Sequence, residues 1–133
     1  MRKCKWLAIL SSVAIIAGCQ PQVVEVKDGF ETLTLQGQAG GPVDSEICGY
    51  IAQRPNHELR LPQAIDYLKI QVNSTAPVTL FIQGPDGSFC ATSIQDRPPQ
   101  ISGYWPAGMY RVFVGTPVAK ISVVYELVMR DRD

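Results

Sequence analysis

The sequence predicts an all-β protein: a single small antiparallel β-sandwich or jelly roll, preceded by an N-terminal signal helix and a short tether. Short segments rich in Val, Ile, Thr, Tyr and Phe alternate between apolar and polar residues, as half-buried strands do. Turns with Gly and Pro separate these segments. Beyond residue 18, no stretch has the periodicity of an amphipathic helix. About eight short strands with such turns are typical of a sandwich.

The first half of the predicted domain contains three strands separated by loops. Apolar and polar residues alternate strictly over residues 31–35, and a glycine-rich loop follows over residues 36–45. Residues 47–51 form the next predicted strand, because they are apolar and flanked by polar residues. A turn at residues 54–57 separates this strand from an alternating one at residues 58–61.

The middle of the domain contains the clearest local signals. Residues 67–72 alternate cleanly and place three aliphatic side chains on one face. Residues 78–82 repeat the pattern, and the Gly-Pro-Asp-Gly sequence at residues 84–87 supplies a tight turn. Residues 89–92 then return as the second strand of a hairpin.

The last third of the chain is expected to begin irregularly and to end in two strands. Residues 93–100 contain two adjacent prolines and carry no strand pattern. Residues 106–108 form a turn that leads into a strand at residues 109–114. The final strand is expected over residues 119–129.

The N-terminus has the pattern of a secretory signal. Arg2, Lys3 and Lys5 precede a short apolar run at residues 6–17. This run is too short to span a membrane, which takes about 20 apolar residues. A buried helix of a cytosolic protein is the alternative interpretation.

The sequence Ile16-Ala17-Gly18-Cys19 resembles the lipobox of bacterial lipoproteins. The resemblance implies cleavage before Cys19 and covalent attachment of diacylglycerol and acyl lipid to that cysteine, which anchors the chain in a membrane. Gln20, in a position where Asp tends to retain lipoproteins at the inner membrane, implies the outer membrane facing the periplasm. The expected organisation is a signal at residues 1–18, a lipidated tether at 19–30 and a sandwich at 31–133.

The lipobox changes the cysteine count. Cys4 leaves with the signal and Cys19 is lipidated, so Cys48 and Cys90 remain. In an oxidising compartment these two are expected to form a disulfide. Two cysteines and one histidine, with no closely spaced pair, do not make a typical zinc site.

Residues 48–127 resemble the bacterial pre-peptidase C-terminal domain, a small β-sandwich appended to many secreted proteins. The matching pieces are residues 66–72, 78–87, 105–110 and 112–115. Cys48 and Cys90 are similar to those of the cysteine-bearing members. The resemblance implies the sandwich fold over this part of the chain.

The same resemblance raises the question of calcium. Members often carry acidic residues just after the segment equivalent to Phe89-Cys90, where this chain has residues 91–93 without a carboxylate. Only Asp86 and Asp96 flank that place, and calcium favours six to eight oxygen ligands. They are weak calcium candidates, so we expect no metal and no cofactor besides the lipid.

Motifs of catalysis are absent from the sequence. His57 is the single histidine, so a Ser-His-Asp mechanism would have to use it. Its position in a predicted turn favours a solvated side chain instead. The balance of 12 basic and 12 acidic residues becomes slightly acidic once the signal is removed, and no basic patch indicates nucleic acid.

Three aromatic residues form the candidate binding surface: Phe89, Tyr104 and Trp105. Exposed aromatic rings stack on sugars or anchor protein partners. In the alternative interpretation Trp105 closes one end of the core. The leading hypothesis is a lipid-anchored, non-catalytic binding or structural module of the cell envelope, with a protein or glycan partner. The alternatives are an accessory or assembly subunit of a larger complex and a small hydrolase that uses His57.

Overall fold

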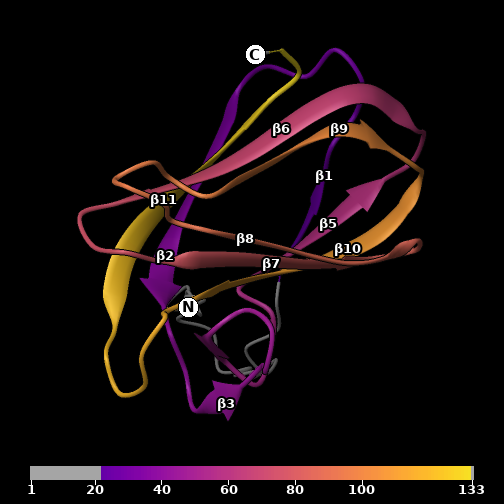
Figure 1. Ribbon diagram of the computed structural model, residues 1–133. Coiled ribbons are helices and arrows are strands. Elements are labelled where there is room, and N and C mark those ends of the chain that lie inside the picture. Colours follow the sequence, from indigo (N-terminus) through magenta and orange to yellow (C-terminus); the bar gives the residue numbers. More distant parts are fainter. Residues whose placement is uncertain (1–21, 133) are drawn as a thin grey trace, which may run out of the picture.

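The computed structural model describes residues 22–132, which form a sandwich of β-strands (Figure 1). These residues contain no helix, and none of their segments is a helix that could cross a membrane. The predicted all-β fold is confirmed. The strands are β1 (Val23–Glu25), β2 (Leu33–Ala39), β3 (Val43–Asp44), β4 (Tyr50–Ile51), β5 (His57–Leu61), β6 (Ile65–Ser74), β7 (Thr79–Gly84), β8 (Gly87–Thr92), β9 (Gln100–Trp105), β10 (Gly108–Gly115) and β11 (Val123–Arg130).

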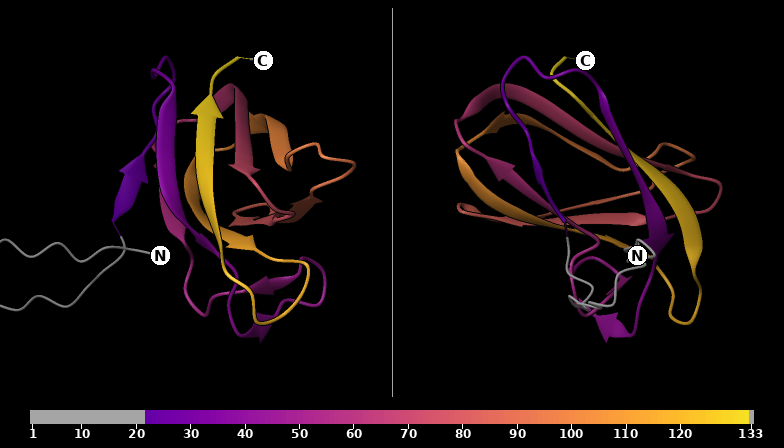
Figure 2. Two further views of the ribbon diagram at one scale, coloured as in Figure 1. Left: turned by 90° about the vertical axis from the view of Figure 1, so that its left-hand side faces the viewer. Right: turned by 180° about the vertical axis from the view of Figure 1, so that it is seen from behind.

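Two sheets pack face to face. Sheet A has the strand order β1-β5-β10-β7-β8, and sheet B has the order β2-β11-β6-β9. Figure 2 shows the four strands of sheet B side by side in its left view. All neighbours in the two sheets are antiparallel except β1 and β5, which are parallel. A third sheet consists only of β3 and β4.

Alternation along the strands builds the core between the sheets. Leu68, Ile70 and Val72 of β6 are fully buried, as the pattern at residues 67–72 predicts. Leu80 and Ile82 of β7 meet them from sheet A. Burial of each such side chain stabilises the fold by roughly 1.5–3 kcal/mol.

The predicted hairpin is confirmed in its register. Strand β7 pairs with β8 so that Gly84 lies opposite Gly87, which leaves Pro85 and Asp86 as the two turn residues. Gly87 has a φ of 128°, a backbone conformation that other residues rarely adopt. The tight turn therefore follows from the Gly-Pro-Asp-Gly sequence.

The tether expected over residues 19–30 is wrong beyond residue 22. Residues 23–25 form β1, which pairs with β5, and Val26 is fully buried in the core. The backbone amide of Val26 also donates to the carbonyl oxygen of Arg60. Three valines in four residues supply enough apolar surface to join the sandwich, although they form too short a run to predict a strand.

Other strand bounds differ from the expected ones for local reasons. Strand β2 continues to Ala39, into the loop predicted over residues 36–45. Strand β9 occupies a stretch before the turn at 106–108 where no strand is predicted. Strand β11 begins only at Val123, after Lys120 has taken a positive φ of 66°. A positive φ interrupts the extended backbone that a strand requires.

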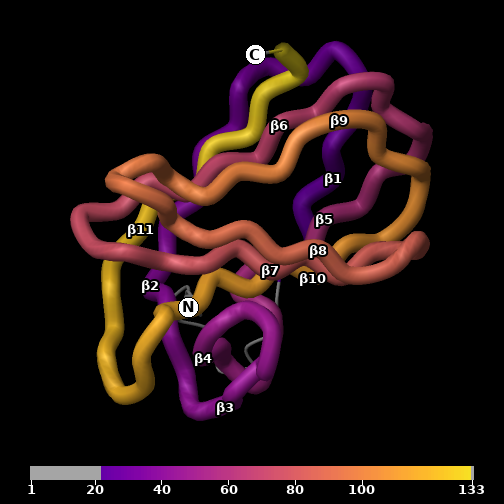
Figure 3. The backbone as a smooth tube through the Cα atoms, in the orientation of Figure 1, coloured from indigo at the N-terminus to yellow at the C-terminus, as the bar shows by residue number. Residues whose placement is uncertain are grey.

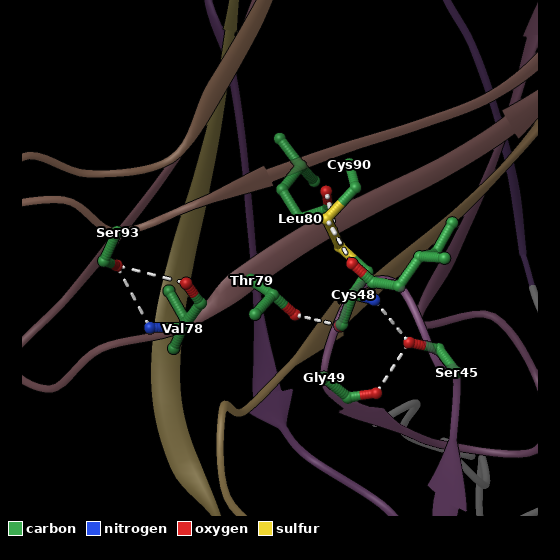
Figure 4. Close-up of a disulfide and its surroundings, with 9 residues drawn as sticks. Ser45, Cys48, Gly49, Val78, Thr79, Leu80, Cys90 and Ser93 are labelled. Carbon is green, nitrogen blue, oxygen red and sulfur yellow. Dashed lines mark hydrogen bonds between the residues drawn. A yellow bond between two sulfur atoms is a disulfide. The ribbon is translucent and has the colours of Figure 1, made fainter.

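A disulfide joins Cys48 to Cys90 and confirms the predicted pair (Figure 4). Their Cα atoms are 5.7 Å apart, within the usual range for a disulfide. Cys48 is buried, whereas Cys90 lies on the exposed edge strand β8. The hydroxyl of Thr79 donates a hydrogen bond of 2.7 Å to the carbonyl oxygen of Cys48.

The disulfide holds the β3–β4 segment, residues 43–51, against the outer face of sheet A. Figure 3 shows this segment looping beneath β7 and β10. Cys48 and Ile51 there cover Phe81 and Phe113, which are buried although they point away from the main core. The segment thus closes a second, smaller apolar cluster.

Close approach of two backbones completes this contact. Tyr50 and Thr116 exchange both of their backbone hydrogen bonds, at 2.8 and 3.0 Å. Gly49, just before them, has a φ of 76°, and a Cβ atom there would lie 2.4 Å from the carbonyl oxygen of Thr116. The positive φ at Gly49 interrupts the extended backbone. For this reason only Tyr50 and Ile51 of the strand predicted over residues 47–51 form a strand, β4.

Replacement of both Cys48 and Cys90 by Ala should lower the free energy of unfolding by about 3–4 kcal/mol, because the disulfide restricts the unfolded chain. Urea unfolding followed by tryptophan fluorescence measures this loss. A reductant should destabilise the wild type by a similar amount and leave the double variant unchanged. Equal stability of the oxidised wild type and the double variant would contradict the role given to the disulfide.

Candidate functional site

The outer face of sheet B carries mostly polar side chains from all four of its strands. Alternation directs one set of residues toward the core and the other set outward. The outward set is dominated by neutral amides and hydroxyls. Its members are Thr34, Gln36, Gln38, Lys69, Gln71, Asn73, Gln100, Ser102, Tyr104, Val124, Glu126, Val128 and Arg130.

Strand register orders these side chains into rows. Arg130 lies opposite Lys69, and Lys69 lies opposite Ser102. In the adjacent row, Gln71 lies between Val128 and Gln100. Lys69, Gln71, Val128 and Arg130 line a small, shallow depression on this face.

Tyr104 belongs to this face, whereas Trp105 does not. Tyr104 is 63% exposed, and it lies two residues beyond Ser102 on the same side of β9. Trp105 is only 5% exposed, and its indole N–H donates a 2.9 Å hydrogen bond to the carbonyl oxygen of Leu68. Its ring centroid lies 5.1 Å from that of Tyr110. The assignment of Trp105 to a binding surface is wrong, because Trp105 closes one end of the core.

Phe89 lies elsewhere as well. It is 47% exposed on the edge strand β8, directly opposite Ile82, a residue of the core. Residues directly opposite one another point to the same side of a sheet. Phe89 therefore borders the open edge of the sandwich, and the three aromatic residues do not form one surface.

His57 occupies a strand and not a solvated turn. It begins β5, is half-buried, and its Nε2 atom lies 2.7 Å from the hydroxyl oxygen of Tyr125 on β11. Burial lowers the pKa of His57 to about 4 and raises that of Tyr125. The imidazole is therefore neutral at neutral pH, and one hydrogen bond joins its Nε2 atom to the tyrosine hydroxyl.

This pair links the two sheets and has no arrangement for nucleophilic catalysis. The only hydrogen-bond partner of the His57 side chain within residues 22–132 is a tyrosine, so no serine is activated there. Gly37 makes room for the ring, since a Cβ atom at that position would lie 2.5 Å from the hydroxyl oxygen of Tyr125. Beside the pair, the Asn56 side chain accepts from the amide of Val114 and donates to the carbonyl of Gln38.

The two calcium candidates lie apart. Asp86 is in the turn before β8 and Asp96 is in the loop after it, so about 20 Å of strand separates them at 3.3 Å per residue. An open groove of about 580 Å³ next to Asp96 is lined by residues of the 72–78 and 93–98 segments. Across residues 22–132, no three His, Cys, Asp or Glu side chains gather as they would around a metal ion.

Cys19 and the signal lie outside the described residues. The lipid anchor therefore stays a prediction from the sequence.

The sequence matches no protein-family model. It is 37% identical over 120 residues to an uncharacterised protein of Synechococcus elongatus, and the match covers 86% of this chain and 88% of that protein.

Solved structures share the fold at low sequence identity. The pre-peptidase C-terminal domain of a collagenase from Bacillus anthracis aligns with a TM-score of 0.53 and 11% identity, over 86% of this chain and all of that domain. The predicted resemblance to this domain is confirmed as a shared fold. A periplasmic inhibitor of g-type lysozyme from Aeromonas hydrophila is more distant, with a TM-score of 0.42 and 11% identity over 83% of this chain and 97% of that protein.

The protein should lose stability as the pH falls from about 6.5 to about 4 through the protonation of His57. Its pKa is depressed in the folded state, so the unfolded chain binds the extra proton in this window. The contribution is fully present above pH 6.5, and its loss amounts to roughly 2–3 kcal/mol.

Urea unfolding of the wild type and of His57→Gln at several pH values isolates this effect, because the chain has one histidine. The variant should lack the histidine part of the pH dependence. Identical pH profiles of the two proteins would show that His57 is not buried in its neutral form.

Proposed function

The chain belongs to the family of the Synechococcus elongatus protein, and we propose that it is a lipid-anchored, non-catalytic binding module of the bacterial cell envelope. The observation that carries this proposal is the outer face of sheet B, an open polar surface with an exposed tyrosine on a rigid sandwich. Side chains on a β-sheet are already held in place by the fold, so binding a partner costs little conformational entropy.

The lipobox supports the envelope location, and the corrected tether adds a geometric consequence. Strand β1 begins at Val23, so only the four residues 19–22, the lipidated cysteine included, precede the fold. Four residues span at most about 14 Å. The domain is therefore held close to the lipid surface.

The disulfide supports an oxidising compartment. Cys48 and Cys90 are joined by a disulfide. Disulfides persist in periplasmic and extracellular proteins, whereas cytosolic thiols are kept reduced. Hydrolysis through His57 loses its support, because the imidazole is engaged with Tyr125 and its pKa of about 4 makes it a weak base.

An accessory subunit of a larger envelope complex is the second candidate, and the edge strand β8 favours it. Strand β8 has no charged residue, carries the half-exposed Phe89 and, among the strands of residues 22–132, pairs with β7 alone. Such an edge offers its backbone to an added strand from a partner.

Labelled palmitate should be incorporated into the wild type and into Cys4→Ser, but not into Cys19→Ser, when each full chain is expressed in a bacterial host. Mass analysis of the mature wild type should find an acylated N-terminus at residue 19. An unmodified Cys19 in the mature protein would contradict the lipid anchor.

A photoreactive residue at position 102, on sheet B, should crosslink the full chain to a specific envelope component in intact cells. The matched probe at position 83, on the outer side of sheet A, should not, because the proposed binding surface lies on the other sheet. Tyr104→Ala should weaken the crosslink without loss of stability, since its side chain is exposed. Equal crosslinking from positions 83 and 102 would contradict the proposed function.

A further inference from the structure

Two cations face each other on the outer face of sheet B. Arg130 of β11 lies directly opposite Lys69 of β6, and both line the shallow depression on that face. Like charges directly opposite one another destabilise a sheet. Within residues 22–132 neither side chain belongs to an ion pair, so no carboxylate of the described chain compensates their positive charge.

Among the acidic residues of the described chain, those nearest to Lys69 and Arg130 in sequence form no ion pair with either cation. Asp131 follows Arg130, but its carboxylate pairs with Arg132 at 3.4 Å. Glu126, on the same face, lies four residues along β11 from Arg130, or about 13 Å at 3.3 Å per residue. Asp66 lies three residues before Lys69 on β6 and belongs to no ion pair in the described part of the chain.

The outer face of sheet A shows the opposite arrangement. Glu58 lies opposite Arg111 in the register of β5 and β10. Arg60 forms an ion pair with Glu25 of the neighbouring strand. The same chain thus matches opposite charges on one sheet and sets like charges together on the other, although its sequence beyond the signal is slightly acidic. A binding function for an anion explains this difference.

The neighbours of the two cations indicate the kind of anion. Gln71, Gln100 and Ser102 offer neutral donors and acceptors, as the hydroxyl groups of a sugar require. The exposed ring of Tyr104, diagonal to Lys69, provides an apolar surface for a sugar ring. A lipid surface would instead favour exposed apolar side chains around the cations, whereas Val128, which lines the depression with them, is only 8% exposed.

The ligand inferred for this face rests on the proposed binding function. We propose that the outer face of sheet B binds an acidic polysaccharide built from uronic acids. Its carboxylates lie against Lys69 and Arg130, where charge-assisted hydrogen bonds form. A sugar ring stacks on Tyr104, and the amides of the adjacent row bind its hydroxyl groups.

Affinity electrophoresis of the full chain in non-ionic detergent tests this proposal, with sodium alginate as the uronate polymer and dextran as the neutral one. Alginate should retard the wild type and dextran should not. Lys69→Gln and Arg130→Gln should each weaken alginate binding about tenfold, because each removes one hydrogen bond to a charged group. Tyr104→Ala should weaken it as well, and added salt should reduce it.

Arg54→Gln is the matched control, because Arg54 is exposed and lies outside both sheets. It should bind alginate as the wild type does. Thermal unfolding supplies a second control: Lys69→Gln and Arg130→Gln should melt at or above the wild-type temperature, because each removes a repulsion. If a variant loses alginate binding while its melting temperature does not fall, the loss comes from the removed side chain and not from unfolding.

Three outcomes would overturn the proposal. One is the absence of alginate binding by the wild type, and another is equal binding by the wild type and the Lys69→Gln/Arg130→Gln double variant. The third is binding of polyglutamate as tight as that of alginate and insensitive to Tyr104→Ala. A specific protein crosslink from position 102 without alginate binding would overturn the ligand while leaving the proposed function intact.

Discussion

The disulfide between Cys48 and Cys90 determines which surfaces of the sandwich stay open. It fixes the β3–β4 segment against sheet A, where that segment buries Phe81 and Phe113. Sheet A is therefore covered by sheet B on its inner face and by the β3–β4 segment at the centre of its outer face. Among the charged side chains that stay exposed on this outer face, Arg60 forms an ion pair with Glu25. Sheet B has no such cover in the described chain, so its outer face is the broad sheet surface left for a partner.

Local sequence patterns predicted most of the strands but only part of their arrangement. Alternation over residues 67–72 and the turn at 84–87 depend on neighbours in the chain, so both appear correctly in the structure. Strand β1 depends on a parallel partner in β5, which no local pattern reveals. The same limit applies to β9, where Gly103 interrupts the apolar alternation between Ile101 and Trp105.

The candidate site shows what residue type alone cannot decide. Tyr104 and Trp105 are adjacent aromatic residues, and strand geometry places them on opposite faces. Recognition of β9 as a strand would have separated them. The Lys69–Arg130 pair joins residues far apart in the sequence, and only the register of β6 and β11 brings them together. Nothing in the local sequence around either residue indicates an anion site.

The central claim is that the outer face of sheet B binds a glycan built from uronic acids. Its most direct test is to map backbone amide chemical shifts of the isotope-labelled full chain during titration with a galacturonate trisaccharide. The chemical shifts that change should cluster at Lys69, Ser102 and Arg130. Changes confined to sheet A around Phe81 or to the edge strand β8, or no changes at all, would contradict it.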